Sequence, residues 1–246
     1  FRRVLFRSPI NGSGHFKIDG GGHTITWEST ANNHHLLGNT SPDADAVYIE
    51  LTNINLDRQD MNAAVGVYNG KITLGKDVAL SGQDGNMILA NGEKAALELG
   101  DGCELSYAAG SSPCCASAWF GAILVLNGGK TAAGAYIGLD CNFYPAVSYP
   151  LISVPKALTG DVHLLLKMIG TTPVAQGIGN YQLTQADCDR LKVNPESTVS
   201  LYMGQRDKYD GNFELHLDPA ASFQIKLRPK NFTPPTSGNI DVTNMT

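Results

Sequence analysis

Apolar and polar residues alternate along most of the chain, and runs of glycine, asparagine and proline separate the alternating segments. Phe16 and Ile18 alternate with Lys17 and Asp19, and the same period of two returns in residues 46–58. This period is typical of strands that bury one face and expose the other. Because it recurs almost to the end of the chain, the sequence predicts an all-β protein.

One longer pattern occurs twice between Ala63 and Tyr107: an apolar strand, Asn-Gly, a second apolar strand that ends in Leu-Gly, and a polar corner. The pairs Asn69-Gly70 and Asn91-Gly92 are 22 residues apart. A third pair, Asn127-Gly128, follows after 36 residues, which fits one repeat plus an insertion of about fourteen residues in the segment 107–117. Repeats of this length are typical of proteins in which each unit is a coil stacked on the next.

Asn-Gly also favours the tight turn of an antiparallel hairpin, so hairpins are the alternative to coils. The strands near the three pairs also end in Leu-Gly or Ile-Gly, at Leu74-Gly75, Leu99-Gly100 and Ile137-Gly138. A coil explains both features, because each corner recurs at the same place in successive turns. Asparagines at such a corner would form a hydrogen-bonded ladder. We therefore predict that six residues are successive corners of one stacked coil: Asn69, Gly70, Asn91, Gly92, Asn127 and Gly128.

One segment predicts a helix. Thr184 followed by Asp187 is a capping signal, and Leu183 and Leu191 bracket a short helix at about 184–192. The remaining segments favour strands, so the predicted fold is all-β with a single short helix.

The strand pattern defines one domain with a segment on either side. The coils are clearest over 15–140 and less regular over 150–229, and the predicted β-helix covers 9–229. Residues 230–246 are polar and contain two adjacent prolines, which predicts a linker or tail. Residues 1–8 include RVLFRS, which resembles a translated sequencing adapter, and we interpret them as a non-native tail. The alternative is a genuine basic and apolar first strand.

The composition argues against several classes of partner. The 246 residues carry a formal net charge of −5, which gives no basic footprint for nucleic acid. No run of about 18 apolar residues occurs, so we expect no transmembrane segment. The chain lacks the Walker, zincin and G-x-S-x-G signatures, and we expect no cofactor.

The five cysteines do not indicate a metal site, because no C-x-x-C pair occurs. Cys114 and Cys115 are adjacent and lie in the small-residue segment 107–117, which predicts a loop. We interpret them as small buried side chains in a turn. A disulfide from Cys103 to this pair is the alternative that the sequence leaves open.

Four segments together carry a family resemblance: IDGGGHTITW, VYIELTNINL, VGVYNGKITLGKDVALSG and LANGEKAALELGDGCELS. They resemble right-handed parallel β-helix proteins of the pectate-lyase-like superfamily and, more narrowly, large secreted surface proteins of gut bacteria. The resemblance covers residues 15–140. It implies a right-handed single-stranded parallel β-helix that is secreted or held at a bacterial cell surface, with its signal peptide lost upstream. The motifs record coil stacking and not chemistry, so they imply a fold and leave the activity open.

Two functions are compatible with this resemblance. The first is a non-catalytic extracellular or cell-surface segment of an adhesin-like protein, with a polysaccharide or host glycan as partner. The second is a polysaccharide lyase or glycoside hydrolase, but hydrolases of this superfamily carry clustered aspartates, and the acidic residues here are scattered. We assign no catalytic residue and favour the first function.

The densest polar cluster at a strand end contains Asp57, Arg58 and Asp60, which we select as ligand-contact candidates. Arg58 could bind a sugar acid, and a solvated corner is the alternative. The adjacent histidines His34 and His35 do not indicate a metal site, because neighbouring residues of an extended chain point to opposite sides.

Overall fold

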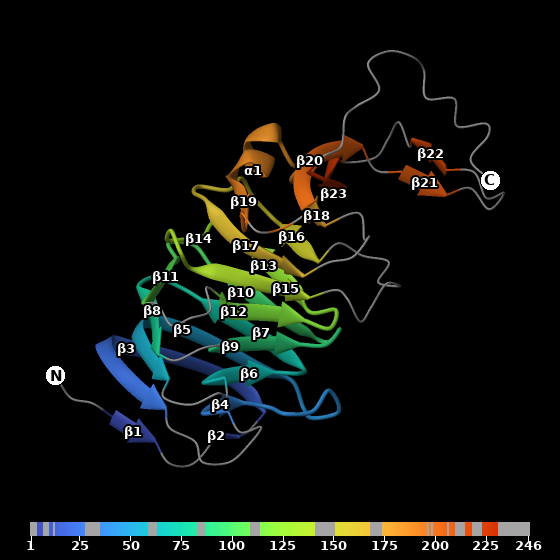
Figure 1. Cartoon of the computed structure of the whole chain (residues 1–246). Helices are drawn as coiled ribbons and strands as arrows, with labels where there is room; N and C mark the ends of the chain where they lie inside the picture. The colour runs from blue at the N-terminus through green and yellow to red at the C-terminus, as the bar shows by residue number, and fades with distance from the viewer. Residues whose placement is uncertain are drawn as a thin grey trace.

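The structure, a computed structural model, is a parallel β-solenoid of about five stacked turns (Figure 1). The N-terminal strands lie at one end of the stack, and the only helix of the described chain lies at the other. The residues that the structure describes are 4–6, 10–11, 13–27, 35–58, 63–82, 87–108, 114–140, 151–167, 174–195, 197, 199–205, 207–209, 215–217 and 223–230.

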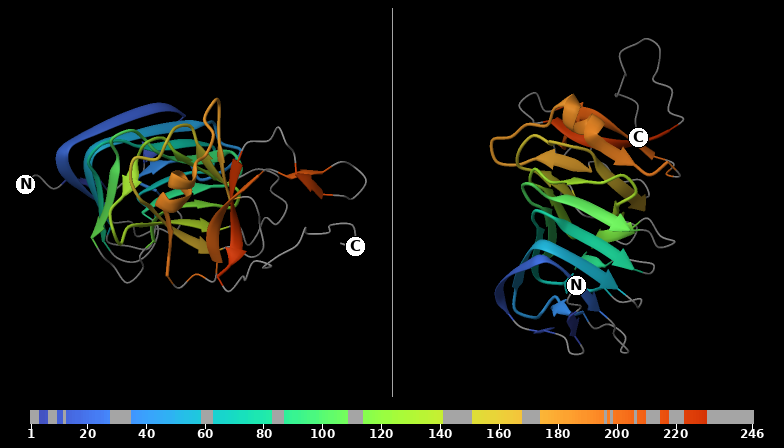
Figure 2. Two further views of the ribbon diagram at one scale, coloured as in Figure 1. Left: turned by 90° about the horizontal axis from the view of Figure 1, so that it is seen from above. Right: turned by 90° about the vertical axis from the view of Figure 1, so that its left-hand side faces the viewer.

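Each turn runs over three faces, and the strands of one face lie above one another along the stack (Figure 2). Face 1 contains the first halves of β3 (Gly14–Trp27) and β5 (Val47–Arg58), followed by β7 (Gly70–Leu74), β10 (Ala95–Leu99), β13 (Ile123–Leu126), β16 (Ile152–Val154) and β18 (Ala175–Gly177). Face 2 contains β1 (Val4–Phe6), the second halves of β3 and β5, β8 (Val78–Gly82), β11 (Glu104–Ala108) and β14 (Lys130–Thr131).

Face 3 is a separate eight-stranded sheet. Its strands are β2 (Ile10–Asn11), β4 (Leu37–Gly38), β6 (Val65–Val67), β9 (Ile88–Asn91), β12 (Cys114–Trp119), β15 (Tyr136–Asp140), β17 (Val162–Lys167) and β19 (Leu191–Val193). All its neighbouring pairs are parallel. The predicted coils are therefore confirmed, and the hairpin alternative is wrong for these strands.

Aliphatic side chains of successive coils stack inside the solenoid. Ile49, Ile72, Leu97, Leu124 and Ile152 form one row in the register of face 1, and each is at most 2 % exposed. Burying one such side chain contributes roughly 2 kcal/mol of hydrophobic free energy. The neighbouring residues along each strand point outward, which is why the sequence alternates with a period of two.

The register gives the length of each coil. Along face 1 the partner residues lie 23 positions apart from Val47 to Gly70 and 25 apart from Gly70 to Ala95. The next coils take 27 positions from Ala96 to Ile123 and 28 from Leu124 to Ile152. The coil therefore varies in length, and the 22-residue spacing of the first two Asn-Gly pairs is not the length of a coil.

Two of the three Asn-Gly pairs lie in the same turn between faces 3 and 1, but the third lies elsewhere, so the prediction of one corner common to all three is wrong. Asn69 precedes β7 and Gly70 is its first residue, so this pair lies where the turn enters face 1. Asn91 is the last residue of β9 and Gly92 follows it, so this pair lies where the turn leaves face 3. Asn127-Gly128 follows β13, at the opposite end of face 1. The feature that recurs in register is Leu-Gly, because Leu99-Gly100 stacks on Leu74-Gly75, whereas Ile137-Gly138 belongs to face 3.

The predicted asparagine ladder is also wrong, because the Asn69 amide bonds to backbone and the Asn127 amide bonds to the Glu98 carboxylate. The Asn69 side-chain amide donates to the Ala44 carbonyl at 2.8 Å, and the Asn39 amide donates to the Asn69 carbonyl at 2.8 Å. Asn39 also accepts from the Tyr68 N–H at 2.6 Å. These bonds join two neighbouring coils, so asparagine stabilises the corner without stacking on another asparagine.

The segment 107–117 is not a single loop. Tyr107 lies within β11 on face 2, and Cys114 is the first residue of β12 on face 3. Cys114 and Cys115 are buried as predicted, but they lie in a strand and not in a turn. Their small side chains fit a strand whose six residues include three alanines or serines in the core.

Val4–Phe6, within the segment interpreted as non-native, forms β1 and pairs in parallel with the end of β3. A first strand is what the alternative interpretation predicts, and the origin of residues 1–8 stays a prediction. Among the described residues, no helix has the length and apolar character that crossing a membrane requires.

The C-terminal end of the stack contains a helix and a group of strands that pair antiparallel. α1 (Gln185–Arg190) begins after the N-cap Thr184, which confirms the predicted helix and its capping box with Asp187. Beyond it, β23 (Phe223–Pro229) pairs antiparallel with both β18 and β20 (Val199–Gln205). A separate antiparallel pair joins β21 (Asp207–Tyr209) and β22 (Leu215–Leu217).

Asp187 ties α1 to the coil beneath it. Its carboxylate accepts from the Tyr181 hydroxyl at 2.6 Å and from the Leu158 N–H at 2.9 Å, and it is 2 % exposed. Thr184 donates two more hydrogen bonds, from its N–H and its hydroxyl. Burial alone would raise the pKa of this carboxyl, but these hydrogen bonds outweigh burial and hold the pKa below its ordinary value.

We predict that Asp187→Ala lowers the free energy of unfolding by about 2–4 kcal/mol at neutral pH, because it leaves buried donors unpaired. The lowered pKa means that this stabilisation is complete above the ordinary carboxyl value of 3.8 and is lost as the pH falls below it. Urea unfolding at pH 7 and pH 3 measures both effects. Asp189→Ala, on the exposed side of the same helix, is the control and should change stability little. Equal losses for the two variants would contradict the assignment.

We also predict that Gly70→Ala and Gly92→Ala differ in cost. Both glycines have positive φ, +125° and +94°, so each substitution strains the backbone by about 1–2 kcal/mol. A Cβ on Gly70 would lie 1.9 Å from the Val47 carbonyl oxygen, whereas a Cβ on Gly92 meets no atom within 4 Å. Gly70→Ala should therefore cost at least about 2 kcal/mol more in urea unfolding. A difference near zero would show that the coils separate freely at this corner.

Candidate functional site

The outward side of face 1 carries an aromatic pair at its N-terminal end. His15 on β3 and Tyr48 on β5 are partners in the register, and their rings stack with centroids 4.5 Å apart and planes 10° apart. Tyr48 is 40 % exposed, which makes it one of the few large exposed apolar side chains of the described chain. Lys71 on β7 follows in the same row. The row therefore offers a flat ring beside a cation.

A second outward row lies beside the first. Lys17 donates to Glu50 at 2.8 Å, and Thr73 follows Glu50 in register. Glu98 comes next, and Lys71 reaches across from the first row to its carboxylate at 2.6 Å. The two rows are thus joined by ion pairs that link one coil to the next.

A groove of about 430 Å³ lies between these rows, and we call it the face-1 groove. This volume is in the range of small-ligand sites. The residues that line the groove are His15, Phe16, Lys17, Tyr48, Ile49, Glu50, Lys71 and Thr73.

Two charged groups in and beside the groove, Lys17 and Glu98, have shifted pKa values. Burial alone would raise the pKa of Glu98, but hydrogen bonds from Lys71 and Asn127 lower it below its ordinary value. The hydrogen bond to Glu50 raises the pKa of Lys17. Glu50 and Glu98 belong to coils two apart, which separates their strands by about 10 Å. A general acid needs a raised pKa, so Glu98 is suited to accept hydrogen bonds and not to donate a proton.

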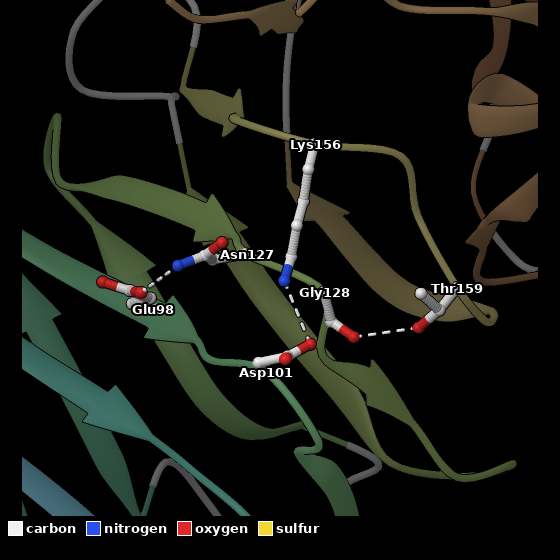
Figure 3. A network of polar contacts seen from close by, with 6 residues as sticks. All are labelled: Glu98, Asp101, Asn127, Gly128, Lys156 and Thr159. Atoms are coloured by element: carbon white, nitrogen blue, oxygen red, sulfur yellow. Dashed lines mark hydrogen bonds and ion pairs between the residues drawn. The ribbon is translucent and has the colours of Figure 1, made fainter.

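Figure 3 shows the corner at Asn127 and Gly128, which contacts the second outward row at Glu98. The Asn127 amide donates to Glu98 at 2.8 Å. Lys156 reaches past Gly128 to the Asp101 carboxylate at 3.0 Å. A Cβ on Gly128 would lie 2.6 Å from Lys156 Cε and 2.7 Å from Asp101 Oδ1. The glycine therefore leaves room for an ion pair between coils that are two turns apart.

The ligand-contact candidates from the sequence lie elsewhere, at the end of β5 on face 2. Asp57 points outward and accepts from Ser81 at 3.1 Å and from Thr26 at 3.4 Å. Arg58 is 0 % exposed, because neighbouring residues of a strand point to opposite sides. Asp60 lies outside the described residues. The structure does not bring Asp57 and Arg58 to one surface, and a ligand role for Asp57 stays a prediction.

The groove residues escaped the sequence patterns because they belong to three different coils. His15, Tyr48 and Lys71 are separated by more than twenty residues in the chain and meet only through the parallel register. A search that aligned successive coils by their inward aliphatic residues, such as Ile49 and Ile72, and then compared the outward positions would have found the row.

The described histidines and cysteines form no metal site. No group of three or more His, Cys, Asp or Glu side chains in the described ranges is placed to hold an ion. His35 is buried, and its Nδ1 lies 3.1 Å from the Ala63 carbonyl oxygen. His34 lies outside the described residues.

Four buried cysteines have free thiols: Cys103, Cys114, Cys115 and Cys188. The disulfide that the sequence left open, from Cys103 to the adjacent pair, is therefore not formed. Burial raises the pKa of Cys103 to about 12 and also raises the pKa of Cys115. A thiol attacks as its thiolate, so these side chains are poor nucleophiles in the folded protein.

We predict that the thiols stay unreactive until the protein unfolds. In a Cys141→Ser background, which removes the cysteine outside the described residues, Ellman's reagent at pH 8 should label the native protein slowly and the denatured protein at four sites. The pKa of these thiols is higher in the folded protein than the ordinary thiol value of 9.0. Their contribution to the stability of the folded protein is therefore complete below pH 9.0 and is lost as the pH rises above it. Fast labelling of the native protein would contradict the burial.

Comparison with known proteins adds no relative: no family profile, curated protein or solved structure matches the chain.

Proposed function

We propose that this chain is a non-catalytic β-solenoid segment of a bacterial surface protein of the adhesin-like kind, and that it binds glycan in the face-1 groove. The observation that carries the proposal is the exposed ring of Tyr48, stacked on His15 and flanked by cross-coil ion pairs.

An aromatic ring beside fixed charges suits a sugar. The apolar C–H face of a pyranose packs on an aromatic face, and its hydroxyls need several donors and acceptors at the rim. Tyr48 supplies the face, and Glu50, Lys71 and Thr73 supply acceptors and donors around it. The stack with His15 holds the ring before the ligand arrives, which reduces the entropy lost on binding.

The shape of the stack supports a surface role. Each coil is bonded to the next along three faces, so the solenoid is a stiff rod with the groove on its side. A rod of this kind presents a lateral binding site at a distance from its point of attachment. A secreted or surface location is part of the proposal.

A polysaccharide lyase or hydrolase is the second candidate. Glu50 and Glu98 lie in one row at about 10 Å, close to the separation of carboxylates in inverting glycosidases. The lowered pKa of Glu98 favours binding over proton donation, and Glu98 is already engaged with Lys71 and Asn127.

We predict that Tyr48→Ala weakens glycan binding at least about tenfold, because it removes the stacking surface. Binding to pectic and glycosaminoglycan oligosaccharides is measured by glycan array and then by calorimetry. Tyr48→Phe should retain the affinity within about threefold because it keeps the ring. Tyr136→Ala, on face 3, is the control away from the groove.

Three results would overturn the proposal. The first is that no oligosaccharide binds the wild-type protein. The second is that Tyr48→Ala binds as tightly as the wild type. The third is that new reducing or unsaturated ends appear when the protein is incubated with these glycans, which would support the enzyme instead.

A further inference from the structure

A second groove is lined by residues of α1, β19 and β20. These elements lie at the end of the stack opposite β3, which carries part of the face-1 groove (Figure 1). The volume of the second groove is about 690 Å³. It is bounded by α1 and β19 on one side and by β20 on the other, and we call it the β20 groove. Nothing in the proposed glycan function uses it.

β20, the terminal strand of its sheet in the described chain, contributes five residues to the wall of this groove. Within the described chain β20 is the last strand of its sheet, and β23 is its only partner there. The five consecutive residues Val199–Met203 all line the groove, although alternate residues of a strand point to opposite faces. The groove therefore follows β20 along its length, and within the described chain the edge of β20 away from β23 has no strand partner. A free strand edge beside a helix is the geometry that accepts an added strand.

The groove is cationic. Lys192, Arg228 and Lys230 line it, against the single carboxylate of Asp189. Lys192 donates to the Asp189 carbonyl and also lies 4.0 Å from the Asp161 carboxylate. Lys230 donates to the Pro195 carbonyl, an acceptor that does not neutralise its charge. The Arg228 guanidinium lies over the Tyr202 ring, 5.3 Å from its centroid. An acidic segment is the charge complement of this surface.

The groove also offers apolar contacts with the period of a strand. Val199, Leu201 and Met203 are half-buried and pack against the core beneath. Ser200 and Tyr202 alternate with them. An incoming strand that alternates acidic and apolar residues would meet the apolar side with one face and the cations with the other.

We propose that the β20 edge binds an extended acidic segment of a partner protein, which adds to the sheet as a further strand. Backbone hydrogen bonds along the seven residues of β20 supply affinity, and the cations at 192, 228 and 230 select for acidic sequence. A second copy of this chain is a poor occupant, because pairing two β20 edges would bring the same cations together.

The test measures binding of the full chain to a fluorescent seven-residue peptide of alternating glutamate and valine, matched in length to β20. The peptide should bind, and affinity should fall at least about tenfold between low and high salt. The double variant Arg228→Glu, Lys230→Glu should reduce affinity at least about tenfold. Lys76→Glu, an exposed lysine outside the groove, is the matched control and should leave binding unchanged. Circular dichroism of each variant verifies its fold.

A second peptide tests the added strand without changing the protein. Methylation of alternate backbone nitrogens removes the donors that would pair with β20 and keeps every side-chain charge, so it should abolish binding. Equal binding of the methylated peptide would reduce the site to charge attraction and overturn the proposal. Failure of the acidic peptide to bind at about 1 mM would overturn it as well. So would displacement of the acidic peptide by a lysine-valine peptide, tighter binding of polygalacturonate than of the peptide, or self-association of the protein through this edge.

Discussion

The parallel register between successive coils is the constraint on which the rest of the structure depends. It places Ile49 under Ile72 and Ile72 under Leu97, so that the interior is a set of aliphatic rows with almost no exposed surface. The same register places the outward residues of those strands in rows as well. Each row of core side chains therefore has a matching row on the surface, and any chemistry on face 1 is assembled from residues 23 to 33 positions apart in the chain.

The sequence predicted what depends on local periodicity and missed what depends on alignment between coils. The alternation of Phe16 and Ile18 with polar neighbours identified a strand, and Thr184 with Asp187 identified the helix start, because both signals lie within a few residues. The Asn-Gly pairs misled because a dipeptide marks a turn without saying which side of the turn it occupies. Glycine is needed at positions 70 and 128 for different reasons. The Val47 carbonyl oxygen lies close to Gly70, and the Lys156–Asp101 ion pair lies close to Gly128.

The candidate site could not be predicted from the sequence, because it depends on how neighbouring coils are aligned. Tyr48 and His15 are unremarkable within their own strands, and they become a stacked pair only when β3 lies beside β5. The prediction that Arg58 is available for ligand contact is wrong. A charged residue at a strand end suggested solvent, but strand parity directs this side chain into the core. The face to which each strand residue points can be predicted from the sequence once the inward positions of that strand have been identified from its aliphatic residues.

The antiparallel pairing of β23 with β18 has a consequence for growth of the stack. All strands of a parallel solenoid run in the same sense around the axis. The last coil therefore exposes strand edges to which another coil of the same direction can pair. Reversing the strand direction at β23 removes such a parallel edge on face 1 while leaving a strand edge at β20. Identical copies therefore cannot continue the parallel register of face 1 from this end into a fibre, and the rod ends in an edge whose direction and charge restrict what can be added.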